Sequence, residues 1–223
     1  MLSPVGASAL LRAVLGPGPA VRELRGQGNP SNLVGPEVQV VARAIESRRR
    51  EFAAGRSCAR EAALETGHDL GPLLSGPTRE PLWPSDLVGS ITHCAGFAGA
   101  AVAPATHWRG LGIDCEPARP LPTELIGAIL TARERFTVAQ LRESEERPWE
   151  RIIFSAKESL FKTWFPLRRT WLGFDEAEVA LQPDGTFQAE ILVLDTGPHP
   201  RTVFGRWRID RGLIVTGLAL PAP

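Results

Sequence analysis

Apolar residues that alternate or cluster between turn residues predict β-strands in two separate parts of the chain. Residues 89–104, GSITHCAGFAGAAVAP, predict two strands joined by a tight turn near Ala95 and Gly96. Residues 109–117, RGLGIDCEP, predict a further strand that Pro117 ends. Closer to the C-terminus, AEVALQ and FQAEILVL flank the turn PDG, and the pattern of VFGRWRID pairs with that of LIVTGLAL. We therefore expect small antiparallel sheets both before and after the middle of the sequence.

Apolar residues at helical spacing predict the first long helix. It begins near Pro36, a residue that favours the first helical turn, and Gly55 weakens its middle, so the segment is one helix or a pair of helices. Its apolar positions are Val38, Val41, Ile45, Phe52 and Ala59. The preceding residues 16–36 are rich in Gly, Pro and Asn and predict an irregular segment.

Two further helices are predicted in the second half of the chain. Thr131 and Glu134 fit a capping box for a helix over residues 132–145, and the next helix covers residues 149–165 and ends before Pro166. Helix followed by strands thus occurs twice. This order predicts an α+β fold of two similar α/β halves, residues 1–108 and 109–223, each with a long helix packed on a small antiparallel sheet.

The charge balance excludes an overall electrostatic attraction to nucleic acid or to a membrane surface, because Lys plus Arg and Asp plus Glu both number 25. No apolar run is long enough to span a bilayer, and no signal peptide is expected, since Arg12 interrupts the apolar N-terminus and no basic segment precedes it. The cysteines Cys58, Cys94 and Cys115 are widely spaced without metal-ligand pairing, which indicates a reducing, cytoplasmic location.

Asp114 and Glu116 lie one residue apart near the end of the strand predicted over residues 109–117. Alternate residues of a strand point to the same face and lie about 6–7 Å apart at the backbone, so the two carboxylates can converge on one hard cation. Oxygen ligands without His or Cys favour Mg²⁺ or Mn²⁺ over zinc. A solvated strand end is the commoner meaning of a bare Asp-x-Glu pair, and this alternative stays open.

The only two lysines of the chain, Lys157 and Lys162, lie in FSAKESLFK on the second of the two later helices. Glu158 lies at the edge of the apolar arc of this helix, Lys162 just beyond it, and Lys157 inside it. An i, i+4 surface pair accounts for Glu158 and Lys162 but not for Lys157. A lysine in such a place serves either a bound anion or a buried acid. Together with Asp114 and Glu116, the set offers three acids for a metal and two lysines for phosphates.

Four motifs occur in an order that resembles a known family. GIDCEP (112–117) followed by FSAKESLFK (154–162) is similar to the paired motifs of the 4'-phosphopantetheinyl transferases of the surfactin- and enterobactin-synthetase type, in an actinobacterial-like form. WPSDLVGSITHC (83–94) resembles the motif ahead of the acidic pair, and RRREFAAGRSCAR (48–60) resembles the family's basic helix near the N-terminus. Order and distances agree over roughly residues 36–175.

The resemblance implies a monomer with its site in a cleft between the halves. It also implies a reaction that moves the phosphopantetheine arm of coenzyme A to a serine of acyl carrier or peptidyl carrier proteins and releases 3',5'-ADP. By match, Asp114, Glu116 and Glu158 hold Mg²⁺, or Mn²⁺, together with the coenzyme A diphosphate, helped by the Cys115 carbonyl. Glu158 is the implied base for the incoming serine, directly or through water.

The remaining matched residues would contact the coenzyme. Lys157 and Lys162 are implied to neutralise the diphosphate as charge builds on the leaving oxygen. Thr92 and His93 match positions that reach its phosphates, although His93 alone would be read as a hydrogen-bonded core histidine.

Arg48 and Arg56 match the residues that grip the 3'-phosphate of the nucleotide, whereas helical phase alone pairs Arg49 with Arg56. The loop before the WP motif carries a lysine in many relatives and no cation between residues 75 and 78 here, so either Arg79 or backbone groups serve instead. The nucleotide-binding residues expected in this loop are Ser75, Gly76 and Thr78.

Two other classes of protein remain open. A Mg²⁺-dependent nucleotide or coenzyme A hydrolase would use the same three acids without a protein acceptor. A non-catalytic module that binds carrier proteins or nucleotides would be favoured by loss of an acid or a lysine from the motifs, and none is missing.

Residues 121–145 are expected to dock the carrier protein, whose surface around its serine is generally acidic. The segment combines arginines with apolar residues, although packing on the core is the simpler account of some of the latter. The residues in question are Leu125, Ile126, Ile129, Leu130, Phe136 and Leu141 among Arg133, Arg135 and Arg142.

Overall fold

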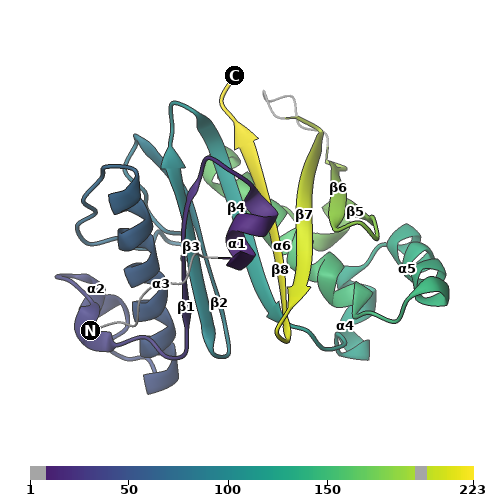
Figure 1. Ribbon diagram of the computed structural model, residues 1–223, viewed down its shortest axis with the longest axis horizontal. Helices are drawn as coiled ribbons and strands as arrows, with labels where there is room; N and C mark the ends of the chain where they lie inside the picture. Colours follow the sequence, from purple (N-terminus) through teal and green to yellow (C-terminus); the bar gives the residue numbers. More distant parts are fainter. Residues whose placement is uncertain (1–8, 194–199) are drawn as a thin grey trace.

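The computed structural model describes residues 9–193 and 200–223 and divides the strands between two antiparallel sheets. The first sheet has the order β1–β3–β2, made of β1 (Ala20–Arg25), β2 (Leu87–Cys94) and β3 (Phe97–Pro104). The second has the order β4–β8–β7–β6–β5, made of β4 (Trp108–Pro117), β5 (Ala177–Leu181), β6 (Thr186–Ile191), β7 (Thr202–Asp210) and β8 (Leu213–Pro221). Figure 1 shows the two sheets side by side. The prediction of an α+β chain with two antiparallel sheets is confirmed.

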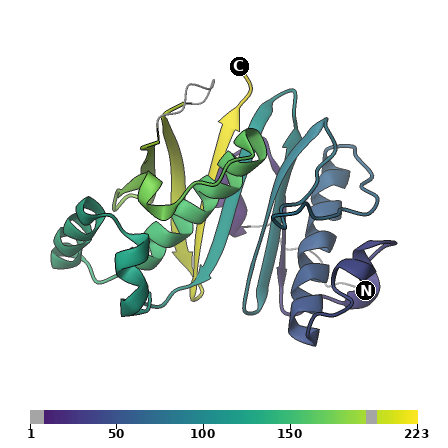
Figure 2. The ribbon, with the colours of Figure 1, turned by 180° about the vertical axis from the view of Figure 1, so that it is seen from behind.

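One long helix packs on each sheet. Helix α3 (Glu46–Glu65) covers the first sheet and buries a row of small residues, Ala53, Ala59 and Ala62. Helix α6 (Trp149–Arg168) lies across β4 and β8 of the second sheet and buries large side chains such as Trp149 and Ile152 (Figure 2). The shorter helices α4 (Thr123–Ile129) and α5 (Ala132–Ser144) connect β4 to α6, and the capping box of Thr131 and Glu134 is confirmed at the start of α5.

The two sheets meet where β2 runs beside β4. Side-chain hydroxyls of β2 join the two strands here. The Ile113 N–H donates to Ser90 Oγ at 3.1 Å, and the Cys115 N–H donates to Thr92 Oγ1 at 2.8 Å. The backbone of the strand that carries Asp114 is therefore fixed to the first half as well as to the second.

Helix α1 (Ala9–Leu15) precedes β1 of the first sheet but packs against β7 and β8 of the second. Its Leu11 and Val14 belong to an apolar cluster that also contains Val21, Ile113 and Val215. The N-terminal segment thus crosses between the halves, and a pseudo-two-fold relation between them stays a prediction.

Three sequence-based boundaries were wrong. Residues 20–25 form β1, although Gly and Pro before and after this segment predicted irregular structure. The first helical segment is a pair of helices, but the break lies between α2 (Glu37–Val40) and α3, before Glu46, rather than at Gly55 where the sequence is weak. Helix α6 continues two residues past Pro166, since a proline in the last turn removes only one backbone bond and the Arg169 N–H closes that turn on the Phe165 carbonyl at 2.8 Å. Two 3₁₀ turns, Pro30–Asn32 and Phe174–Glu176, complete the secondary structure of the described residues.

Gly112 allows α6 to lie directly on β4. A Cβ atom at this position would come within 1.9 Å of the Ser159 carbonyl oxygen and 2.2 Å of Thr163 Oγ1. Only glycine therefore permits the approach that brings Asp114 of β4 next to Lys162 of α6. No helix in the described part of the chain is long and apolar enough to cross a membrane.

Candidate active site

A cavity of about 630 Å³ lies between the two halves, within the usual size range of small-molecule sites. Its walls come from α3, the loop before β2, strand β2 itself and helix α6. Among the residues predicted from the sequence, those that line it are Arg48, Arg56, Ser75, Gly76, Thr78, His93, Glu158 and Lys162. Residues more than a hundred positions apart in the chain are thus brought to one site.

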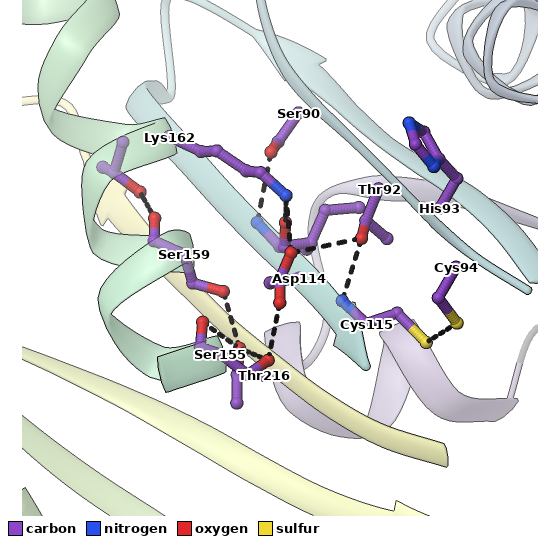
Figure 3. A network of polar contacts seen from close by, with 12 residues as sticks. Ser90, Thr92, His93, Cys94, Asp114, Cys115, Ser155, Ser159, Lys162 and Thr216 are labelled. Atoms are coloured by element: carbon purple, nitrogen blue, oxygen red, sulfur yellow. Dashed lines mark hydrogen bonds and ion pairs between the residues drawn. The ribbon is translucent and has the colours of Figure 1, made fainter. Parts of the chain in front are cut away.

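Asp114 is the centre of a buried polar network beside this cavity (Figure 3). Its Oδ1 accepts a hydrogen bond from Lys162 Nζ at 2.7 Å and lies 3.5 Å from Thr92 Oγ1. Its Oδ2 accepts from Ser155 Oγ at 2.9 Å, and Ser155 is itself 2.9 Å from Thr216 Oγ1. Lys162 therefore pairs across the strand–helix interface with Asp114, and the i, i+4 surface-pair alternative with Glu158 does not describe it.

Glu116 and Glu158 complete the acidic side of the site. Burial and the nearby Asp114 carboxylate raise the pKa of Glu116, although its ion pair with Arg151 at 2.9 Å opposes this. Burial also raises the pKa of Glu158. The attraction of Lys162 opposes that shift, whereas Asp114 and Glu116 add to it. The three carboxylates are thus close enough to repel one another, and a cation between them would relieve this repulsion.

The donor set fits a hard divalent cation, because it offers carboxylate oxygens and no imidazole or thiolate. Lys162 and Arg151 now neutralise Asp114 and Glu116, respectively. Within the described residues, no group of three or more His, Cys, Asp or Glu side chains is already assembled around one point. A metal would therefore have to draw the carboxylates together and compete with these two cations.

The Cys115 side chain points away from the acids. Its sulfur lies 3.4 Å from the sulfur of Cys94, inside the apolar cluster that includes Ile113 (Figure 3). Its N–H points toward β2, where it meets Thr92. Because the N–H and C=O of one strand residue point to the same side, the Cys115 carbonyl also faces the junction of the two halves.

The basic side of the cavity is built on α3. Arg56 is almost fully buried, donates to the Leu73 carbonyl at 2.7 Å and to Ser75 Oγ at 2.9 Å, and has its pKa lowered by burial to about 10, so it stays charged at neutral pH. Arg48 lies 2.7 Å from His93 Nε2. Burial and the Arg48 charge lower the pKa of His93, which keeps the imidazole neutral as an acceptor for Arg48. His93 thus lies in the cavity wall, bonded to Arg48, and is not a core histidine.

The loop that holds Ser75, Gly76 and Thr78 is shaped by Glu80. Ser75 bridges Pro81 across the loop, and Glu80 accepts from both the N–H and the hydroxyl of Thr78. Glu80 also reaches across to the second half, where Arg169 donates to it at 2.9 Å. Arg79, whose backbone is left-handed with φ 70°, also lines the cavity. This loop therefore supplies a cation just after Thr78.

Asp114, Cys115 and Glu116 lie outside the cavity lining, and two further predicted residues, Thr92 and Lys157, also point elsewhere. Thr92 is only 2% exposed and its hydroxyl joins β2 to β4, so in this structure the hydroxyl faces Asp114 and Cys115 rather than the cavity. The prediction that Lys157 faces a phosphate is not met. Its ammonium is buried against Glu134 at 2.8 Å, because it points to the opposite part of the α6 surface from Lys162. The alternative reading, a lysine that serves a buried acid, is the correct one.

Sequence reasoning missed several residues that shape the site. Ser155 and Thr216 fix the second oxygen of Asp114, and Glu51 pairs with Arg48 at 3.4 Å and faces His93. Helical spacing could have found Glu51, which lies three residues after Arg48. Thr216 lies 102 positions after Asp114 and is opposite it in the β4–β8 register, which no local pattern reveals.

Comparison with known sequences decides the family. A profile described as the 4'-phosphopantetheinyl transferase N-terminal domain matches residues 36–103, and one described as the 4'-phosphopantetheinyl transferase superfamily matches residues 110–215. The chain is 46% identical over 203 residues to 4'-phosphopantetheinyl transferase Svp of Streptomyces mobaraensis, which covers 87% of this chain and 82% of the relative. The chain belongs to the 4'-phosphopantetheinyl transferase family.

Other members of the family agree. The transferase is 40% identical over 192 residues to PptT of Mycobacterium tuberculosis, covering 82% of this chain and 84% of that one. It is 36% identical over 137 residues to enterobactin synthase component D of Salmonella typhi, covering 59% and 54% of the two chains. The transferase is thus an enzyme whose family moves phosphopantetheine from coenzyme A to carrier proteins.

Proposed function

We propose that the transferase moves the 4'-phosphopantetheine arm of coenzyme A to a serine of acyl carrier and peptidyl carrier proteins, in a Mg²⁺-dependent reaction that releases 3',5'-ADP. The observation that carries this proposal is the polarity of the cavity. The first-half wall carries Arg48, Arg79 and the buried Arg56, and the second-half wall carries Lys162 and Glu158, whose carboxylate is repelled by Asp114 and Glu116 nearby. A coenzyme with a phosphate at one end and a diphosphate near its reacting bond matches both walls.

Asp114, Glu116 and Glu158 are the residues that would hold Mg²⁺, or Mn²⁺, helped by the Cys115 carbonyl, which faces the junction of the two halves. When bound, the metal supplies positive charge to the diphosphate of the coenzyme. Lys162 hydrogen-bonds Asp114 from the cavity wall, so its ammonium can turn toward a diphosphate oxygen and stabilise the charge that builds there.

Glu158 is the base in this scheme. Burial raises the pKa of Glu158 toward neutral pH. Such a pKa suits a group that must accept the serine proton, directly or through water. Arg48 and Arg56 would grip the 3'-phosphate, and Ser75, Gly76 and Thr78 would face the nucleotide from their loop. Lys157 has no part in this contact, because it is buried away from the cavity.

The carrier protein is proposed to dock on α4 and α5, which follow the strand end that bears Asp114. Charge and exposure support this. Arg133 is 78% exposed at its side chain, and Leu125 and Phe136 are exposed apolar residues nearby in the chain. Ile129 and Leu130 are instead buried in the core, as the simpler account of the segment expected.

The proposal is tested by measuring 3',5'-ADP. Coenzyme A and Mg²⁺ are incubated with the transferase in the presence and absence of an apo carrier protein. We expect 3',5'-ADP only with the carrier, and none when a chelator replaces Mg²⁺. Formation of 3',5'-ADP without any carrier would instead indicate a hydrolase.

A further inference from the structure

Lys157 uses all its hydrogen-bonding capacity inside the protein, away from the cavity. Its ammonium donates to the Ile129 carbonyl at 2.9 Å, to the Phe174 carbonyl at 2.6 Å and to Glu134 Oε2 at 2.8 Å. An ammonium has three donors, so none is left for a ligand. Lys162, five residues on, points about 140° away around the same helix.

Glu134 extends this contact to two more elements. Its Oε2 also accepts from the Thr131 N–H at 2.7 Å, and its Oε1 accepts from the Val179 N–H at 2.7 Å. Both side chains of the pair are almost completely buried, 2% exposed for Lys157 and 1% for Glu134. One ion pair therefore ties the end of α4, the start of α5, the turn before β5 and strand β5 to helix α6.

Stability alone is a poor reason for this arrangement. Burial lowers the pKa of Lys157 and raises that of Glu134, against their mutual attraction, which shows that desolvation works against both charges. Apolar side chains of similar volume often stabilise a core as well as a buried ion pair does. A pair with directed hydrogen bonds differs from apolar packing in fixing how the connected elements are oriented.

The elements on the two sides of the pair have different roles in the proposed reaction. Lys157 is the neighbour of Glu158 on α6, whereas Glu134 lies in the first turn of α5, between exposed Arg133 and exposed Phe136. We propose that Lys157 and Glu134 are positioning residues that set the α4–α5 surface relative to Glu158, and so govern use of the carrier protein rather than binding of coenzyme A. This inference rests on the proposed carrier-dependent function.

The test uses the double substitution Glu134→Gln with Lys157→Met in the full chain. Glutamine keeps an acceptor for the capping box, and methionine fills the lysine volume without a buried charge. Thermal unfolding verifies that the variant is folded at the assay temperature. Titration calorimetry then gives the dissociation constant for coenzyme A, and loading kinetics give kcat/KM for an apo carrier protein.

We expect kcat/KM for the carrier to fall on the order of tenfold or more, because small displacements between binding and reacting groups are costly. The dissociation constant for coenzyme A should not change. The single variant Lys157→Arg, which keeps the charge and several donors, should lose less kcat/KM for the carrier than the double variant does. A matched contrast is Arg60→Met, which breaks the ion pair with the fully buried Glu37 in the first half and should spare KM for the carrier.

The outcomes are distinct. A folded double variant with unchanged kcat/KM for the carrier, or with coenzyme A binding weakened as much as carrier use, overturns the positioning role. A wild-type protein that binds coenzyme A but never loads a carrier overturns the proposed function instead. If the double variant does not fold, the same two measurements on Glu134→Gln and on Lys157→Arg decide the matter, since each keeps a hydrogen bond across the pair.

Discussion

Substitution of Asp114 separates the requirements of folding from those of the reaction. Asp114→Ala removes the acceptor of Lys162 and of Ser155 in a site that is 6% exposed. A hydrogen bond to a charged group contributes about 1.5–3 kcal/mol, and Lys162 is partly exposed and keeps the Ile113 carbonyl at 3.1 Å, so the lower end applies. The substitution also removes the repulsion of Asp114 with Glu116 and Glu158, which offsets about 1 kcal/mol of the lost free energy of unfolding.

The free energy of unfolding of metal-free Asp114→Ala should therefore fall by about 1–2 kcal/mol. This loss reflects the buried hydrogen-bond network around the carboxylate. Asp114→Asn keeps the shape and one acceptor and should lose less. Both variants should load a carrier protein more slowly by on the order of 100-fold or more, because a charge proposed to hold the metal is gone.

Urea unfolding in a chelator and carrier loading followed by intact mass measure the two effects. Asp184→Asn, an exposed carboxylate in the turn between β5 and β6, is the control and should leave both unchanged. Near wild-type loading by Asp114→Asn would refute the metal assignment. A loss of more than about 4 kcal/mol in Asp114→Ala would show that the residue is mainly structural.

Three further predictions follow from the same geometry. Lys162→Ala should slow turnover by on the order of 10–1000-fold at saturating coenzyme A. Arg56→Ala should instead chiefly raise the Michaelis constant for coenzyme A, as steady-state kinetics can measure. A fall in turnover alone in Arg56→Ala would contradict this. Charge reversal at Arg133 and Arg135 should raise the Michaelis constant for the carrier in a salt-dependent way and leave coenzyme A binding alone, and unchanged loading kinetics would place the docking surface elsewhere. Because burial raises the folded-state pKa of Glu158, the metal-free protein should lose stability as pH rises from about 4.3 through that raised pKa and then level off. Urea midpoints should show this loss reduced in Glu158→Gln, and an equal pH dependence in that variant would contradict the assignment.

The alternation of residues along a strand and the phase of a helix predicted part of the geometry around Asp114. Asp114 and Glu116 were placed on one face of a strand, and Lys162 was placed on the helix that packs against it, because both inferences need only local periodicity. Short-range signals also gave the β2–β3 hairpin and the capping box at Thr131.

What the sequence could not supply depends on long-range packing. The position of Lys157 inside an apolar arc indicated a buried partner or an anion, but only the fold brings Glu134, 23 residues earlier, to its ammonium. Strand β1 was missed because its six residues are bounded by Gly- and Pro-rich segments, and its pairing with β3 lies more than 70 positions away. The hydroxyls of Thr92 and Ser90 were not predicted to join the two halves, since nothing local marks β2 as the neighbour of β4.

The most direct test of the central claim is the intact mass of an apo carrier protein after incubation with coenzyme A, Mg²⁺ and the transferase. The account predicts that each carrier gains one phosphopantetheinyl group at its serine. It also predicts no gain when that serine is replaced by alanine, and strongly slowed gain with Glu158→Gln. An unchanged carrier mass with the wild-type transferase, or full loading by Glu158→Gln at the wild-type rate, would contradict it.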